Sequence, residues 1–305
     1  MLTRQLPFRA VFKNLPSFTA DNVPLFRSTH FKPESPVAFQ QQQFTSSIPA
    51  IRKWLLPLKP GNKDTALTLN EKYFDSQPDV SVPLERTTNV PLQDSEQEAK
   101  GIFERLEAPL SLFTAWTTKK LLNPSVFEPN TSLYLAQCDL PSLPPQLQLD
   151  LPPLKLVLEA GKGDIYASSL WMGVPPTNTP LHRDPNPNLL IQLAGRKVVR
   201  MIRPQFGRAV YQHTRQICAE VEGSQFSGGD IRGDEMMVGL ERNILDDFMW
   251  NDGHESSRDV VEVEGYDTTL EAGDGVFIPK GWWHSVRGVG TAEDGINASV
   301  NWWFR

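Results

Sequence analysis

The chain carries a His-x-Asp motif near its middle and a further histidine close to its end, and together they restrict the folds it can adopt. His182 and Asp184 flank Arg183. Successive side chains of a β-strand alternate between its faces, so His182 and Asp184 point the same way and Arg183 points the opposite way. Two imidazoles and one carboxylate suit one face of an octahedral iron(II), with the other positions left open. The second imidazole must come from elsewhere in the fold, and His284 is the candidate.

A lone His-x-Asp motif is common, and it usually marks an exposed turn or a surface histidine paired with a carboxylate. The surrounding sequence favours the metal site instead. Asn188 and Lys197 follow the motif, and a Gly-Asp-Gly turn at 273–275 and Pro279 precede His284. This combination and its order predict a metal centre formed by His182, Asp184 and His284.

Composition narrows the classes of function. The 305 residues allow one large domain, or one domain with an extension, and 39% hydrophobic residues suffice for a packed core. A net charge of −6 argues against direct nucleic-acid binding, since no basic stripe is available. No apolar run is long enough to span a bilayer, so we expect no membrane partner. Only Cys138 and Cys218 occur, which favours a reducing compartment, the cytoplasm or the nucleus.

Residues 1–20 form a basic N-terminal arm. They contain Arg4, Arg9 and Lys13 and no acidic residue, interleaved with apolar side chains. This pattern is compatible with a mitochondrial leader, although Pro7 interrupts a helix and serines are scarce. A leader and an untargeted arm both stay open.

Residues 21–128 mix short extended and helical signals, and they predict an α+β unit that supports the second half of the chain. Pro36–Phe39 is typical of a strand, and Ile51–Leu56 of a short helix. Ser95 followed by Glu98 resembles a capping box. The helix that it would open places three apolar residues on one side before a proline stops it: Ile102, Phe103, Leu106 and Pro109.

Residues 129–305 change to short strands separated by glycine and proline. Such strands predict a mainly β protein built as a double-stranded β-helix, or jelly roll, because this fold avoids exposed sheet edges. The strands are expected at residues 133–137, 165–172, 189–193, 197–202, 276–278 and 298–304.

An insertion at about 205–268 separates the two halves of the metal motif. Two interpretations stay open, a solvated surface loop and a mobile lid whose negative field favours a cationic substrate. The negative charge is concentrated in residues 246–274, which contain one arginine and ten carboxylates: Asp246, Asp247, Asp252, Glu255, Asp259, Glu262, Glu264, Asp267, Glu271 and Asp274.

Six segments of the second half carry a resemblance to a known family: 134–137, 170–173, 179–184, 188–190, 195–197 and 300–303. From Tyr134 to Arg305 the chain resembles the JmjC, or cupin-like, family of iron(II)- and 2-oxoglutarate-dependent dioxygenases, and in particular its small hydroxylase branch. Within this branch it is most similar to the arginyl hydroxylase group, because of its Tyr-Leu-Ala-Gln strand and a terminus just after paired tryptophans.

The resemblance implies that a lysine binds the distal carboxylate of 2-oxoglutarate. Lys197 fits this role, because an ammonium facing inward beside Val199 and Met201 needs an anion to offset its desolvation. Hydroxyl groups would add hydrogen bonds to the same carboxylate, and amides would orient the end of the cosubstrate nearest the metal. The residues in these two roles are Tyr134 and Thr179 for the hydroxyls, and Asn188 and Asn301 for the amides.

The reaction implied is oxidative decarboxylation of 2-oxoglutarate by dioxygen to succinate and carbon dioxide, coupled to hydroxylation of a protein or peptide side chain. Glu85 lies in a segment similar to one that supplies a substrate-facing acid in such enzymes, and the aromatic face of Trp171 suits a cation. Arginine or another cationic residue is the favoured substrate. Demethylation of an N-methyl group, hydroxylation of a small molecule and a non-catalytic cupin that binds partners stay open as alternatives.

Overall fold

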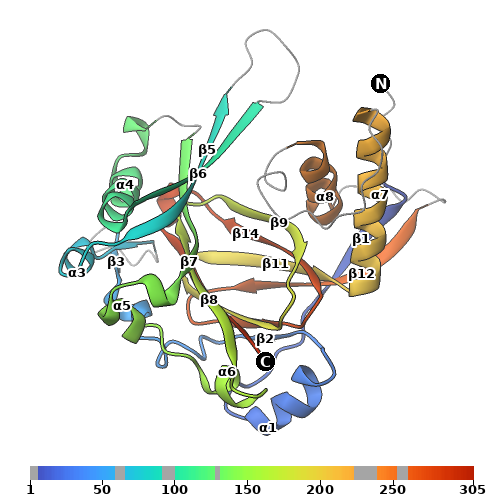
Figure 1. Ribbon diagram of the computed structural model, residues 1–305, viewed down its shortest axis with the longest axis horizontal. Coiled ribbons are helices and arrows are strands. Elements are labelled where there is room, and N and C mark those ends of the chain that lie inside the picture. Colours follow the sequence, from blue (N-terminus) through green and yellow to red (C-terminus); the bar gives the residue numbers. More distant parts are fainter. Residues whose placement is uncertain (1–5, 59–65, 91–99, 128–130, 223–238, 253–259) are drawn as a thin grey trace.

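Two facing β-sheets form the centre of the molecule (Figure 1). The computed structural model describes residues 6–58, 66–90, 100–127, 131–222, 239–252 and 260–305. The larger sheet contains, in spatial order, β2 (Val37–Phe39), β13 (Gly275–Ile278), β10 (Asn188–Ala194), β15 (Asn297–Phe304), β8 (Ile165–Gly173), β7 (Thr131–Asp139), β5 (Ser81–Val90) and β6 (Lys100–Pro109). The smaller sheet contains β1 (Phe8–Asn14), β12 (Val261–Leu270), β11 (Arg196–Ile202), β14 (Trp283–Val289) and β9 (Thr177–Arg183).

The described pairings in these two sheets are antiparallel, except that of β1 with β12. The mainly β jelly-roll class predicted from the sequence is therefore confirmed. The six strands expected between residues 133 and 304 are present as β7, β8, β10, β11, β13 and β15.

Strand β15 shows how one segment builds both the core and an interior polar surface. Every second residue is apolar and packs into the largest hydrophobic cluster, which joins the larger sheet to the N-terminal half: Ala298, Val300, Trp302 and Phe304. The residues between them face the space between the sheets: Asn297, Ser299, Asn301 and Trp303. A second apolar cluster fills part of that space, with Leu190 and Val276 from the larger sheet against Val199 and Met201 from the smaller.

The N-terminal half follows the predictions only in part. The strand expected at Pro36–Phe39 is β2. The helix expected at Ile51–Leu56 is α2 (Ala50–Lys53), and it ends early because β3 (Leu55–Pro57) pairs with β4 (Leu67–Leu69). Asp150, which is fully buried, accepts hydrogen bonds from Lys53 and Trp54 and fixes this corner to the second half of the chain.

The prediction of a helix that runs up to Pro109 is wrong. Lys100–Pro109 forms strand β6 and pairs with β5 along its whole length, with Arg86 against Glu104 and Glu85 against Arg105. These cross-strand pairs prevail over the helical spacing of the apolar residues. Pro109 precedes a helix, α4 (Leu110–Leu122), and does not end one. Ser95 and Glu98 lie outside the described residues.

The inserted segment is partly helical. Helices α7 (Pro204–Glu222) and α8 (Leu240–Trp250) cover the outer face of the smaller sheet, where Val210, Leu245 and Phe248 pack against Trp283. Strand β12 also falls within the range expected for the insertion, but it belongs to the smaller sheet. From the N-terminal arm, β1 pairs with β12, and Lys13 binds Glu264 at 2.5 Å.

The other described helical elements are short. They are α1 (Val23–Phe26), η1 (Arg27–Phe31), α3 (Glu71–Asp75), η2 (Pro124–Val126), η3 (Leu140–Ser142), α5 (Pro145–Leu149), α6 (Lys155–Glu159) and η5 (Ala292–Asp294). No helix in the described part of the chain has both the length and the apolar character needed to cross a membrane.

Candidate metal centre and its cavity

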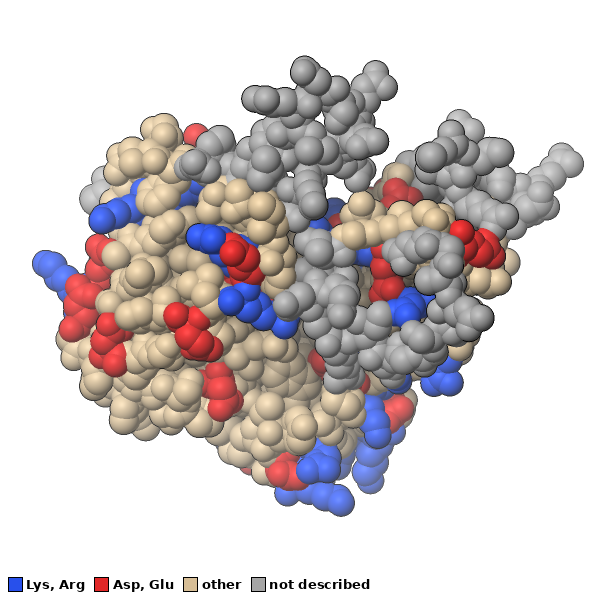
Figure 2. All heavy atoms as spheres, turned by 45° about the horizontal axis from the view of Figure 1, so that its top comes forward, with Lys and Arg blue, Asp and Glu red and all other residues tan. Residues whose placement is uncertain are grey.

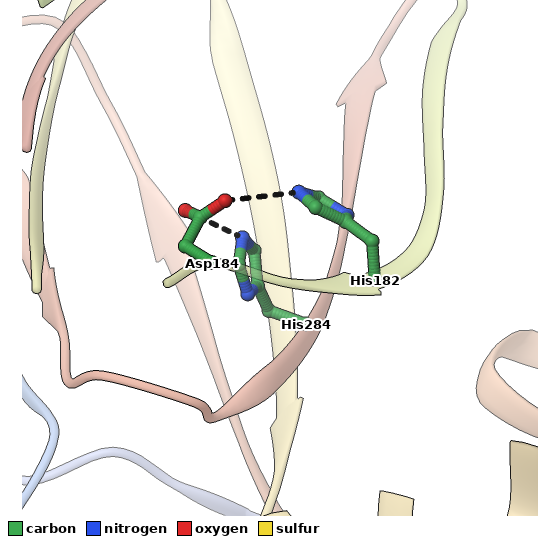
Figure 3. Close-up of side chains that lie close together, drawn as sticks. All are labelled: His182, Asp184 and His284. Carbon is green, nitrogen blue, oxygen red and sulfur yellow. Dashed lines mark ion pairs between the residues drawn. The ribbon is translucent and has the colours of Figure 1, made fainter. Parts of the chain in front are cut away.

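Strands β9 and β14 bring the predicted metal ligands together. His182 and His284 lie directly opposite each other in the pairing of these strands, and Asp184 follows the end of β9. Asp184 Oδ1 lies 4.0 Å from His182 Nε2, and its Oδ2 lies 3.7 Å from His284 Nε2. The three side chains point toward one another in Figure 3, and one possible ligand atom from each lies within 4.8 Å of the others. This arrangement fits one face of an octahedral metal.

Each histidine is oriented by a nearby backbone carbonyl. Nδ1 of His182 lies 2.8 Å from the carbonyl oxygen of Pro180, and Nδ1 of His284 lies 3.1 Å from that of Trp282. A carbonyl oxygen only accepts, so Nδ1 carries the proton and Nε2 presents its lone pair to the site. Burial, and then the neighbouring His182, lower the pKa of His284 to about 4, which keeps this imidazole neutral.

Asp184 is held by two donors on one of its oxygens. Oδ2 accepts a hydrogen bond from Trp303 Nε1 at 2.7 Å and one from Asn188 Nδ2 at 3.1 Å. Burial alone would raise the pKa of Asp184, but His284, His182 and these two hydrogen bonds outweigh it and lower that pKa. Asp184 is therefore a carboxylate, with Oδ1 near His182 and Oδ2 near His284.

Asn188 and Asn301 continue this support away from the metal centre. Asn301 donates from Nδ2 to Oδ1 of Asn188 at 3.0 Å, and Trp171 donates from Nε1 to Oδ1 of Asn301 at 2.8 Å. A chain of hydrogen bonds thus runs from Trp171 through both asparagines to Asp184. Asn188 therefore contacts the carboxylate of Asp184 directly, and Asn301 contacts Asn188, whereas the sequence predicted that both amides orient the cosubstrate. That role stays a prediction.

Lys197 lies on the inner face of β11 and is 4% exposed. Its Nζ donates to Oγ of Ser299 and to the hydroxyl of Tyr134, the latter at 3.4 Å. No carboxylate pairs with it among the residues that the structure describes, and burial lowers its pKa to about 7. A buried ammonium with only neutral partners suits the distal carboxylate of a dicarboxylic cosubstrate. Burial, and then Glu85, raise the pKa of Tyr134, so its hydroxyl keeps its proton.

Two residues near Lys197 were not singled out from the sequence. Ser299 accepts a hydrogen bond from Lys197. The alternation of apolar and polar residues along β15 could have identified it, because Ser299 falls on the polar face of that strand. Gly288, on β14, pairs with Lys197 of β11 on one side and with Thr177 of β9 on the other. A Cβ at Gly288 would come within 2.3 Å of Thr177 Oγ1, so this glycine leaves room for the side chains of Thr177 and Asn297. Trp303 entered the sequence analysis only as one of the paired tryptophans, without its hydrogen bond to Asp184.

A cavity of about 910 Å³ opens above the metal centre. Its lining includes His182 and Asp184, together with Thr179, Tyr134 and Trp171 from the predicted site. The ring of Trp171 lies 6.4 Å from that of Tyr134, centroid to centroid. One wall comes from β5 and β7, and the opposite wall comes from α8 of the insertion. The cavity is large enough for a side chain that enters from solvent together with a small cosubstrate.

Glu85 lines this cavity from β5, as expected for a substrate-facing acid. Its carboxylate already has a cationic neighbour, because Oε1 lies 3.4 Å from Nε of Arg105 on β6. Its side chain is 17% exposed. A substrate cation at this position would therefore share Glu85 with Arg105.

Several carboxylates of the acidic insertion have partners, which bears on the two interpretations left open, a solvated surface loop and a negative lid. Asp246 binds Arg287 at 3.0 Å and accepts two hydrogen bonds from Asn178, and Asp252 binds Arg200. Asp274 accepts hydrogen bonds from backbone N–H groups. Glu255 and Asp259 lie outside the described residues. In Figure 2 the acidic and basic side chains are interspersed, with no continuous basic area on the coloured part of this face.

Comparison with known proteins adds a family match. The model of the cupin-like domain family matches residues 24–305. The chain is 27% identical to "Lysine-specific demethylase JMJ30" of Arabidopsis thaliana over 144 residues, which cover 47% of this chain and 27% of that protein. It is 28% identical to "Lysine-specific demethylase 8" of Danio rerio over 172 residues, 56% of this chain and 36% of that protein. The chain thus spans well under half the length of these curated relatives.

Proposed function

Because this chain belongs to the cupin-like domain family, we propose that it is an iron(II)- and 2-oxoglutarate-dependent dioxygenase that modifies a protein side chain. The observation that carries the proposal is the convergence of His182, Asp184 and His284 at the base of a cavity, with Lys197 buried nearby. When bound, the iron and 2-oxoglutarate would supply the oxidation of a substrate C–H bond by dioxygen, with release of succinate and carbon dioxide.

The residues of the chain bind and orient these groups. Both imidazoles present Nε2, and hydrogen bonds from Trp303 and Asn188 hold the carboxylate of Asp184 beside them. Lys197 and Ser299, which are hydrogen-bonded to each other, would bind the distal carboxylate of 2-oxoglutarate, and the nearby hydroxyl of Tyr134 would donate to the same group.

Hydroxylation of a cationic side chain, arginine first, is our preferred reaction. Glu85 and Trp171 line the same cavity as His182, and they offer a carboxylate and an aromatic face to a guanidinium. Demethylation is the second candidate, and the names of the two demethylases above favour it. Both reactions use the same metal centre and differ in which carbon of the substrate lies above it.

A turnover screen tests the proposal. The iron-loaded protein is incubated anaerobically with 2-oxoglutarate and a peptide library that contains arginine, lysine and their N-methylated forms, and air is then admitted. Mass spectrometry distinguishes the gain of one oxygen atom from the loss of one methyl group. Asp184→Ala is the control and should be inactive. A loaded wild-type protein that neither forms succinate nor modifies any peptide contradicts the proposal.

A further inference from the structure

Arg242 stands out among the charged residues that line the cavity. It lies in the first turn of α8, is half-buried, and faces the same cavity as His182. Its Nε is buried and has no hydrogen-bond acceptor. A buried donor without an acceptor is costly in a folded protein, so its presence in a cavity wall suggests a ligand group that completes it.

The other arginines of the cavity wall have partners. Arg287 binds Asp246 at 3.0 Å, and Arg105 lies 3.4 Å from Glu85. Arg183 lies over the ring of Trp283, 5.9 Å from its centroid. Within the described part of the chain, Arg242 is the lining arginine that has neither an ion pair nor an aromatic ring to contact. Among the described arginines that line the cavity, Arg242 is therefore the one whose charge remains available to a ligand.

The fold holds Arg242 in a fixed position relative to the metal centre. Arg242 and Asp246 are four residues apart and so lie on the same face of α8. Asp246 attaches this face to β9 and β14 through hydrogen bonds with Asn178 and Arg287. Asn178 precedes His182 by four residues on β9, which corresponds to roughly 13 Å along a strand. Asp246 thus attaches α8 at a point about four strand residues from His182, a distance that an extended peptide of about four residues spans and a single amino acid does not.

We propose that Arg242 forms a second binding site in the cavity, which takes the carboxylate of an acidic residue a few positions away from the modified residue of a peptide substrate. A planar guanidinium matches a carboxylate through paired hydrogen bonds. The inference rests on the proposed function for the class of substrate. It adds that the preferred segment carries an acid as well as the residue that reaches the metal centre.

Peptide binding to the protein loaded with manganese(II) and 2-oxoglutarate tests this site without turnover. The probes are fluorescent peptides with a central arginine and one glutamate, moved through the flanking positions, each matched by the same peptide with glutamine. Wild-type protein should bind the glutamate peptide about tenfold more tightly at one or two positions on one side of the arginine. Phosphoserine in place of glutamate shows whether phosphate is accepted as well.

Three variants decide the outcome. Arg242→Gln should abolish the preference for glutamate, whereas Arg208→Gln, an exposed arginine of α7, should retain it. Arg242→Glu should reverse the preference, so that this variant binds a peptide with lysine at the same position more tightly than one with glutamate. A misfolded protein would not gain such binding. Wild-type protein that binds both matched peptides equally, or binds neither, overturns the inference, as does a preference that survives in Arg242→Gln.

These outcomes are separate from those of the turnover screen. Loss of the proposed function appears as a failure to form succinate from 2-oxoglutarate. Loss of the second site appears as equal binding of the glutamate and glutamine peptides, whether or not turnover occurs.

Discussion

The two ends of the cavity are built differently. At its base, His182 and His284 lie on paired strands and Asp184 follows the first of them, and each of the three side chains has at least one hydrogen bond. At its mouth, the lining comes from α8 and from the β5–β6 hairpin, and the charges there are held by partners such as Asp246 with Arg287. If the base carries the proposed chemistry and the mouth contacts the substrate, mutations at the two ends should have different effects.

The largest effect is expected at the metal ligands. His182→Ala or Asp184→Ala removes one of three ligands and should abolish both metal binding and turnover, while the thermal unfolding midpoint of the metal-free protein changes little. Anaerobic titration with manganese(II), followed by elemental analysis, measures the loss. Undiminished metal content in both variants would show that the site lies elsewhere.

Lys197→Ala should weaken 2-oxoglutarate binding by about 3–5 kcal/mol, the cost typical of breaking a buried charge pair. Thr179→Val should weaken it less, because only one hydrogen bond to the cosubstrate is lost. Calorimetry with manganese(II)-loaded protein gives both dissociation constants. Equal constants for the wild type and Lys197→Ala would mean that another cation binds the distal carboxylate.

The pH dependence of cosubstrate binding should also trace to Lys197. Burial lowers its pKa to about 7 in the free protein, and a bound carboxylate restores the charged form. Below pH 7 the ammonium is already charged and affinity is at its full value. As pH rises above 7 a proton must be taken up on binding, so the affinity should fall, approaching about tenfold per pH unit. Lys197→Ala should lack this slope, and a wild-type affinity independent of pH between 7 and 9 would contradict the assignment.

Trp303→Phe tests how far the base of the cavity depends on residues behind the ligands. It removes the hydrogen bond to Asp184 and keeps an aromatic ring, so manganese(II) affinity should fall by about tenfold. Trp116→Phe, on α4 and outside the cavity lining, is the matched control. If the two variants bind manganese(II) alike, Trp303 serves only as packing.

The smallest effect is expected at the mouth. Glu85→Gln should raise the KM for an arginine peptide by roughly threefold and leave that for a neutral peptide unchanged, because Arg105 already offsets part of the Glu85 charge. Association of the arginine peptide should also slow as salt rises, since exposed charges are screened beyond about 8 Å at physiological ionic strength. A silent variant with salt-independent kinetics would favour a neutral side chain or a small molecule.

The base of the cavity also shows which features of the fold and the site could be predicted from the sequence and which could not. Strand β15 carries a period of two, and β10 and β15 both lie in segments that resemble a known family, so their positions followed from local pattern. The His-x-Asp spacing is local as well, whereas His284 was joined to it through the order of the surrounding residues and the resemblance. The order of the strands brings Ser299 to Lys197 and Trp303 to Asp184, and no single segment contains that information.

The wrong or incomplete predictions involve residues whose structure depends on a distant partner. Lys100–Pro109 has apolar residues at helical spacing but becomes a strand because β5 pairs with it. The carboxylates near Asp246 left a negative lid open as one of two interpretations, because a cationic partner such as Arg287 lies far away in the sequence. Arg242 attracts notice for the opposite reason, since only the folded chain shows that it lacks a partner.

The two faces of strand β15 limit how the sequence of this strand can change during evolution. Its two faces serve two purposes, because Val300 and Trp302 hold the core while Ser299 and Asn301 support the site. A one-residue insertion or deletion within it would exchange the faces, bury amides in the core and place apolar side chains at the site. By contrast, the first turn of α8, which carries Arg242, contains no fully buried side chain, and the core contacts of this helix begin at Leu245. Substrate choice can therefore diverge by small steps there, while β15 changes only through substitutions that respect both faces at once.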